Sequence, residues 1–239
     1  MGREKLRQPI RRCGEIVTSS DLPEEVAAIR GSISKFLDQK DDDGRKIGNS
    51  NFGVYAFYDY DREPIYVGQT KEQLRVRILR HLTNQRTDAV AMNVLDPFEV
   101  AEIEVWPIYP TKSERAVIGE ILDRAEYTVF EKVLRESALK AVLNEKDIPK
   151  KTKTTLPRPY RARIIPDEVY ALRKHPDIRI ARRASTIAAL ARVISERDVS
   201  KGLRRTLLTQ ARRLESLARI RLDQITGDAP VENPGKDAA

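Results

Sequence analysis

Residues 52–68, FGVYAFYDYDREPIYVG, decide the fold that the sequence predicts. Two runs rich in aromatic and β-branched residues, 52–59 and 64–68, are joined by a short polar connection, which is typical of a β-hairpin. Because successive side chains of a strand point to opposite faces, Tyr55 of the first run and Tyr66 of the second can project to one side of the strand pair.

The regions around this hairpin predict helices and one more strand. Apolar residues recur at helical spacing in 21–38, 70–84 and 112–136, and the run 99–108 favours a strand. We therefore expect an α+β fold in which a small three-stranded antiparallel sheet is flanked by helices.

Charge divides the 239-residue chain into two unlike parts. Residues 1–150 hold 24 Lys and Arg against 26 Asp and Glu, whereas residues 151–225 hold 19 against 7, and the whole chain carries +8. A basic module attached to a nearly neutral domain is a natural reading of this imbalance. The expected parts are an N-terminal extension with one helix (1–50), the domain that holds the hairpin (51–150), a basic proline-containing linker (151–166), a helical basic module (167–225) and a disordered tail (226–239).

Composition excludes several classes of protein. The one cysteine, Cys13, rules out an intrachain disulfide, and with only two histidines it cannot form a Cys/His zinc finger. The chain has no apolar run of about 18 residues, the length that a membrane-spanning helix requires. We expect a cytoplasmic protein with no membrane partner, and the net positive charge favours a polyanionic partner such as DNA.

Tyr55 and Tyr66 are the first candidates for chemistry. A phenol has a pKa of about 10, so it is a poor base unless a cation or a hydrogen-bond partner assists it. Tyrosines are also common strand residues that only pack, and the hairpin alone favours that simpler role.

The helix expected at 70–84 adds a cation beside this hairpin. Arg77 and His81 are four residues apart and therefore share a helix face. An arginine fork matches a phosphate group, and a neighbouring histidine can relay a proton. The alternative is a solvated basic helix, because Arg75 and Arg80 lie in the same segment.

The helix expected at 112–136 supplies a carboxylate. Glu126 lies among apolar helix positions, where an ionised carboxylate is costly unless it is paired or bound to a metal ion. Glu131 competes for this role but has more polar neighbours. A hard divalent ion such as Mg²⁺ prefers oxygen ligands. A salt bridge to a buried arginine is the alternative.

Together these residues resemble the GIY-YIG nuclease family over about residues 51–147. The matching positions are Gly53-Val54-Tyr55, Tyr66-Val67-Gly68, Arg77, His81, Glu126 and Asn144. The resemblance implies a DNA endonuclease, with a restriction-type enzyme as one candidate. It also implies that the enzyme uses Mg²⁺ or Mn²⁺ held by Glu126 and leaves 5′-phosphate and 3′-hydroxyl ends. The stretch from Glu126 to Asn144 is longer than in the family pattern, which keeps Glu131 open as the metal ligand.

Arginines of the C-terminal third are candidates for contacts with nucleic acid. Arg205, Arg212 and Arg219 recur every seven residues and so lie near one helix stripe, and Arg182 and Arg183 form a second pair. Such residues can bind phosphates without reading sequence. A solvated bundle face and a helix that forms a homodimer are the alternatives.

Two other functions are open at this stage. One is a catalytically silent DNA-binding protein on the same scaffold. The other is an adaptor protein that presents its basic helices to an acidic partner protein.

Overall fold

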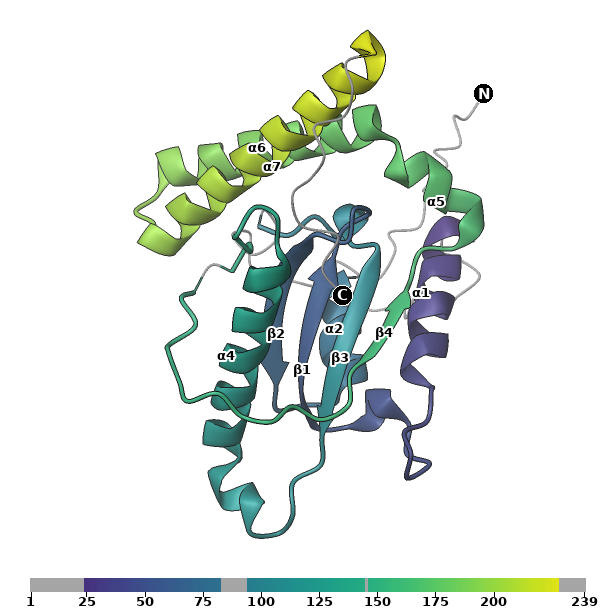
Figure 1. The fold of residues 1–239 in the computed structure, drawn as a ribbon, viewed down its shortest axis with the longest axis vertical. Helices are drawn as coiled ribbons and strands as arrows, with labels where there is room; N and C mark the ends of the chain where they lie inside the picture. Colours follow the sequence, from purple (N-terminus) through teal and green to yellow (C-terminus); the bar gives the residue numbers. More distant parts are fainter. Residues whose placement is uncertain (1–23, 83–93, 145, 228–239) are drawn as a thin grey trace, which may run out of the picture.

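A four-stranded antiparallel sheet forms the centre of the protein, seen in a computed structural model that describes residues 24–82, 94–144 and 146–227. The order of the strands is β2-β1-β3-β4 (Figure 1). Their bounds are β1 Phe52–Tyr58, β2 Pro64–Thr70, β3 Glu102–Ile108 and β4 Tyr160–Arg163. The expected α+β class is therefore confirmed, with one strand more than the sequence predicted.

Helices cover both faces of this sheet and one of its ends (Figure 1). The α-helices are α1 Glu24–Leu37, α2 Leu74–Leu82, α4 Ile118–Glu136, α5 Asp167–Lys174, α6 Pro176–Glu196 and α7 Lys201–Thr226. Short 3-10 helices are η2 Ile47–Asn49, η3 Pro97–Glu99 and η4 Glu114–Val117. No helix among the described residues is long and apolar enough to cross a membrane. Residues 1–23 and the predicted tail from 228 onward lie outside the described residues.

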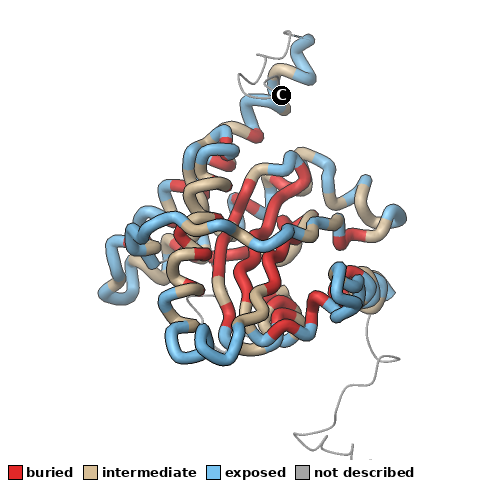
Figure 2. The backbone as a smooth tube through the Cα atoms, turned by 60° about the horizontal axis from the view of Figure 1, so that its bottom comes forward, coloured by how far each residue is buried: buried red, intermediate tan, exposed pale blue. Residues whose placement is uncertain are grey.

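The alternation of β1 builds two cores, one on each face of the sheet. Val54 and Ala56 pack with residues of α4, including Val129. Tyr55 and Phe57 point the other way, into a core that contains residues of α1 and α2. Figure 2 shows the resulting band of buried backbone through the middle of the molecule. Tyr55 is therefore delivered to the face that α2 covers.

The fourth strand lies inside the segment that the sequence analysis placed in a linker. Tyr160 pairs with Val105 and Arg163 pairs with Glu102, so β4 extends the sheet beyond β3. Arg161 anchors the strand, because its Nε donates to a carboxylate oxygen of Glu102 at 2.7 Å and its guanidinium lies 3.7 Å from the centroid of the Tyr58 ring. The linker prediction is wrong for these residues, because four residues with no apolar run carry little strand signal.

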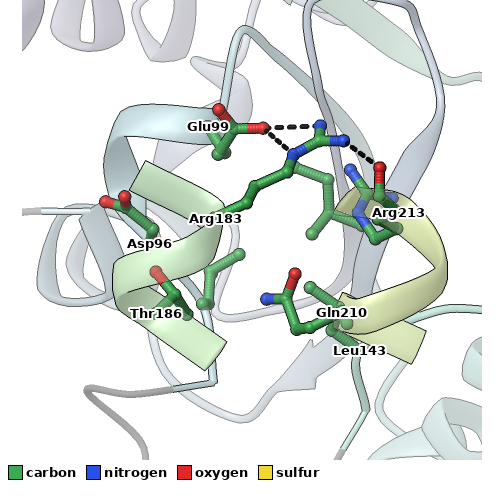
Figure 3. A pocket seen from close by; sticks show the side chains of 9 residues that line it. Asp96, Glu99, Leu143, Arg183, Thr186, Gln210 and Arg213 are labelled. Atoms are coloured by element: carbon green, nitrogen blue, oxygen red, sulfur yellow. Dashed lines mark hydrogen bonds and ion pairs between the residues drawn. The ribbon is translucent and has the colours of Figure 1, made fainter. Parts of the chain in front are cut away.

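The C-terminal helices dock onto the end of the sheet through buried arginines. Asp59, at the end of β1, accepts hydrogen bonds from Arg179, Arg183 and Arg213 at 3.3, 3.0 and 2.6 Å. All three guanidinium groups are buried, and Arg183 also pairs with Glu99 (Figure 3). The helices expected to form a separate basic module are thus joined to the sheet by ion pairs.

A small cavity adjoins this arginine cluster. It has a volume of about 10 Å³ and is lined by residues that include Glu99, Arg183, Gln210 and Arg213 (Figure 3). That is space for about one water molecule. The cavity therefore belongs to the packing of α6 and α7, and substrate chemistry has to be sought elsewhere.

Candidate active site

The Tyr55 hydroxyl lies at the centre of a polar cluster between β1 and α2. The Nε–H of Arg77 donates to the Tyr55 oxygen at 3.1 Å, and Nε2 of His81 lies 3.1 Å from the same oxygen. Tyr55 and His81 are buried, whereas Arg77 is half-buried. The spacing of four residues puts Arg77 and His81 on one face of α2, as expected, and both side chains approach the Tyr55 oxygen.

Tyr66 closes one side of this cluster. Its ring stacks on that of Tyr55 with 6.2 Å between centroids and lies 5.5 Å from the His81 ring. The β1–β2 register places Tyr66 opposite Phe57, so the two tyrosines meet diagonally across the hairpin. Tyr66 is half-buried and lies nearer the surface than Tyr55.

Gly68 makes room for these rings, and the sequence analysis did not give it a role of its own. It lies directly opposite Tyr55 in the register. A Cβ at this position would lie 2.6 Å from the Tyr55 oxygen and 2.9 Å from a ring carbon of Tyr66. Both rings would have to move, so a side chain at residue 68 is incompatible with the cluster.

We expect Gly68→Ala to displace Tyr55 and to destabilise the protein by about 1–3 kcal/mol, the usual cost of overpacking a core. Thermal unfolding measures the loss. Gly31→Ala is the matched control, because a Cβ on this α1 residue meets nothing within 4 Å, and there alanine should stabilise the helix by up to about 1 kcal/mol. Equal stability of G68A and the wild type would contradict the tight contact.

Glu126 lies on α4, close enough to this cluster for its charge to raise the pKa of Arg77. Its Oε2 accepts a hydrogen bond from Nε2 of Gln69 at 3.1 Å, and the same nitrogen donates to Oδ1 of Asp123 at 2.9 Å. Burial raises the pKa of Glu126 to about 7, with the Asp123 charge adding to the rise and Gln69 and Arg77 opposing it. Neither Gln69 nor Asp123 was singled out from the sequence, although Asp123 lies three residues before Glu126 on the helix.

These side chains offer oxygen donors to a hard cation. Two carboxylates, Asp123 and Glu126, approach a single amide nitrogen, and the Gln69 carbonyl oxygen is buried without a hydrogen-bond partner among the described residues. Mg²⁺ is commonly held by one or two carboxylates together with water. A positive charge would also offset the repulsion from Asp123, which adds to the effect of burial on the pKa of Glu126. The donor set fits a divalent cation.

Glu131 faces a different environment. Its carboxylate lies 3.6 Å from Nζ of Lys153, in the segment that leads to β4. Glu126, by contrast, accepts a hydrogen bond from Gln69, and its charge acts on Arg77. The geometry therefore favours Glu126 over Glu131 as the carboxylate of the site.

Asn144 acts on the backbone of β2. Its Oδ1 accepts from the Val67 N–H at 3.2 Å, and its Nδ2 donates to the Val67 carbonyl at 2.7 Å. The neighbouring Leu143 N–H donates to the Ile65 carbonyl at 2.7 Å. Asn144 thus fixes the strand that carries Tyr66 and Gly68.

The arginines expected to bind nucleic acid are placed unequally. Arg183 is buried against Asp59 and Glu99, so that prediction is wrong for Arg183 because its charge is satisfied inside the protein. The others lie nearer the surface: Arg182 is paired with Asp96, Arg205 with Asp147 and Arg219 with Glu215, and Arg212 is exposed. Contacts of these four residues with DNA stay a prediction.

Comparison with protein families identifies the class of protein. Residues 51–137, the segment that contains Tyr55, Tyr66, Arg77, His81 and Glu126, match the model of the GIY-YIG catalytic domain, which is a nuclease domain. This match supports membership of the GIY-YIG nuclease family for residues 51–137, as the resemblance implied. Nucleases of this family generally depend on a divalent metal ion. No curated protein and no solved structure matches the chain.

Proposed function

We propose that the protein is a Mg²⁺-dependent DNA endonuclease whose active site contains Tyr55, Tyr66, Arg77, His81 and Glu126. The observation that carries the proposal is the position of the Tyr55 oxygen, which Arg77 and His81 approach at 3.1 Å each. A guanidinium next to a phenol stabilises the phenolate, and an imidazole can accept the proton that the phenol releases. Arg77 and His81 thus provide the cation and the hydrogen-bond partner that a phenol requires to act as a base.

Each side chain then has one task in the hydrolysis of a phosphodiester. Tyr55 takes the proton of the attacking water, with His81 as the next acceptor. Arg77 holds the scissile phosphate. Burial works to lower the pKa of Arg77, but Tyr55, Tyr66 and Glu126 together outweigh burial and raise it, so the guanidinium keeps its charge. Tyr66 covers Tyr55 and His81, because its ring stacks on the Tyr55 ring and lies beside the His81 ring. Asn144 keeps β2 in place.

Glu126, with Asp123 beside it, would hold the cation. When bound, a divalent ion stabilises the negative charge that develops on the leaving oxygen. Cleavage by this route leaves a 5′-phosphate and a 3′-hydroxyl. A restriction-type role, a cytoplasmic location and a homodimer are further parts of the proposal, and a dimer would supply two sites for the two strands of DNA.

The test compares Glu126→Ala with Glu131→Ala on supercoiled plasmid. We expect the wild type to convert the plasmid in Mg²⁺ and to leave it intact in EDTA. E126A should lose at least about a hundredfold in rate, the usual effect of removing a charge-stabilising group. E131A should stay within a few-fold of the wild type, because Glu131 contacts Lys153 instead.

The opposite ranking, with E131A inactive and E126A active, would reject Glu126 as the ligand. A wild type that binds plasmid but never cuts it in Mg²⁺ would instead identify a catalytically silent DNA-binding protein.

A further inference from the structure

Residues 146–159 run from the region of Asn144 to β4, and we call this segment the strap. Figure 1 shows it passing along the outer side of α4 and then across the molecule to β4. Most of the strap lies in the segment 151–166 that was predicted to be a linker. We propose that the strap is a phosphate-binding track that holds DNA beside the active site, an inference that rests on the proposed nuclease function.

The strap is fixed to the protein in a definite register. The Thr154 N–H donates to Oγ1 of Thr128 at 3.1 Å, and Nε of Arg124 donates to the Thr152 carbonyl at 3.3 Å. Ile148 and Leu156 pack against the core between α4 and the sheet. A segment held by backbone bonds and apolar contacts presents its side chains at set positions.

Three of its exposed side chains are lysines. Lys150, Lys151 and Lys153 are exposed, whereas Thr154 and Leu156 are half-buried. Lys151 lies 3.7 Å from Asp123, and Lys153 lies 3.6 Å from Glu131. Exposed ion pairs of this kind contribute little stability and exchange readily with other partners. The ammonium groups are thus available to a phosphate backbone.

The position of Lys151 links the strap to the reaction. Its partner Asp123 shares the Gln69 amide with Glu126. One lysine of the track therefore stands next to the carboxylates, and the others continue along α4. DNA whose scissile phosphate reaches Arg77 would run its neighbouring phosphates past this row of positive charge.

Three arginines of the C-terminal helices are not available for the same task. In the interior, the carboxylates of Asp59 and Glu99 form ion pairs with Arg179, Arg183 and Arg213. The strap lysines, by contrast, carry only long and exposed ion pairs. The positive charges after residue 150 therefore have two roles. Buried arginines of α6 and α7 dock these helices onto the sheet, and exposed lysines of the strap form the track.

The test measures binding of a labelled mixed-sequence DNA duplex in EDTA, where no cutting occurs. We expect K150Q/K151Q/K153Q to weaken the affinity about tenfold or more and to lower the salt slope by roughly 2–3, since each phosphate contact contributes about 0.9 to that slope. The matched control K35Q/K40Q/K174Q removes three exposed lysines near α1 and α5, and it should bind like the wild type. The arginine triple K150R/K151R/K153R should retain both affinity and slope.

Wild-type affinity and an unchanged salt slope in the strap glutamine variant would overturn the inference, as would an equal loss in the control. Plasmid cutting by the same wild-type preparation separates the two proposals. Cutting with strap-independent binding rejects the track alone, whereas strap-dependent binding without any cutting rejects the nuclease function and keeps the track.

Discussion

Arg77→Ala should reduce plasmid cleavage by about a thousandfold, which is the scale on which removal of a phosphate-stabilising arginine or oxyanion donor acts. The substitution removes the Nε–H that donates to Tyr55 and the charge that would meet the phosphate. Arg77 is half-buried at the edge of the pocket, so the fold should survive. Initial rates on supercoiled plasmid in Mg²⁺ measure the effect, and circular dichroism checks the fold.

Arg77→Lys is the informative companion. Lysine keeps the positive charge but lacks the planar fork that can reach the Tyr55 oxygen and a phosphate at once. We expect R77K to recover only a small part of the lost rate. If R77A kept more than a tenth of the wild-type rate, Arg77 would not be the residue that holds the scissile phosphate.

Asp59→Ala should destabilise the protein by about 3–5 kcal/mol, the usual cost of leaving a buried charge without its partner. The substitution leaves Arg179, Arg183 and Arg213 facing one another. It also removes the oxygen that accepts from the N–H groups of residues 61 and 63 in the turn after β1. Chemical denaturation measures the loss.

Asp61→Ala is the matched control, because the Asp61 side chain is half exposed and pairs with Arg179. Without Asp61, the buried Arg179 still has Asp59 and Glu99 as partners, so we expect a loss of only about 1 kcal/mol. Losses of the same size in D59A and D61A would contradict the account of α6 and α7 as docked through Asp59.

The same cluster predicts sensitivity to acid. Burial works to raise the pKa of Asp59, but Arg213, Arg179 and Arg183 outweigh it, so the pKa lies below its ordinary value of 3.8. A carboxyl group with a lowered folded-state pKa stabilises the fold above its unfolded-state pKa, and this contribution is lost as the pH falls through the folded-state value. The difference in stability between the wild type and D59A should therefore be full at neutral pH and shrink below about pH 4.

The core of the site could be predicted because its geometry is local. Strand alternation sets the face of Tyr55, and helical spacing sets the common face of Arg77 and His81. The apolar pattern of α4 favoured Glu126, although the spacing to Asn144 left Glu131 open as the metal ligand. In each case the regularity of one element determines where the side chain points, so the sequence contains the necessary information.

Other features depend on contacts between distant segments and left no local signal. Asp59 meets Arg213 across 154 positions of sequence, and nothing near Arg213 distinguishes it from the exposed Arg212. The pairing of β4 with β3 also joins segments that are far apart in the sequence. Asn144 was named only as a position that matches the family, and the folded register shows that its amide bonds to the backbone of Val67.

The most direct measurement is the analysis of the DNA ends that the purified wild-type protein leaves after incubation with supercoiled plasmid in Mg²⁺. We expect nicked or linear product whose ends carry a 5′-phosphate and a 3′-hydroxyl. A DNA ligase should therefore join these ends without prior kinase or phosphatase treatment. Plasmid that stays supercoiled, or ends that ligate only after a 3′-phosphate is removed, would contradict the proposed chemistry of Tyr55, Arg77 and Glu126.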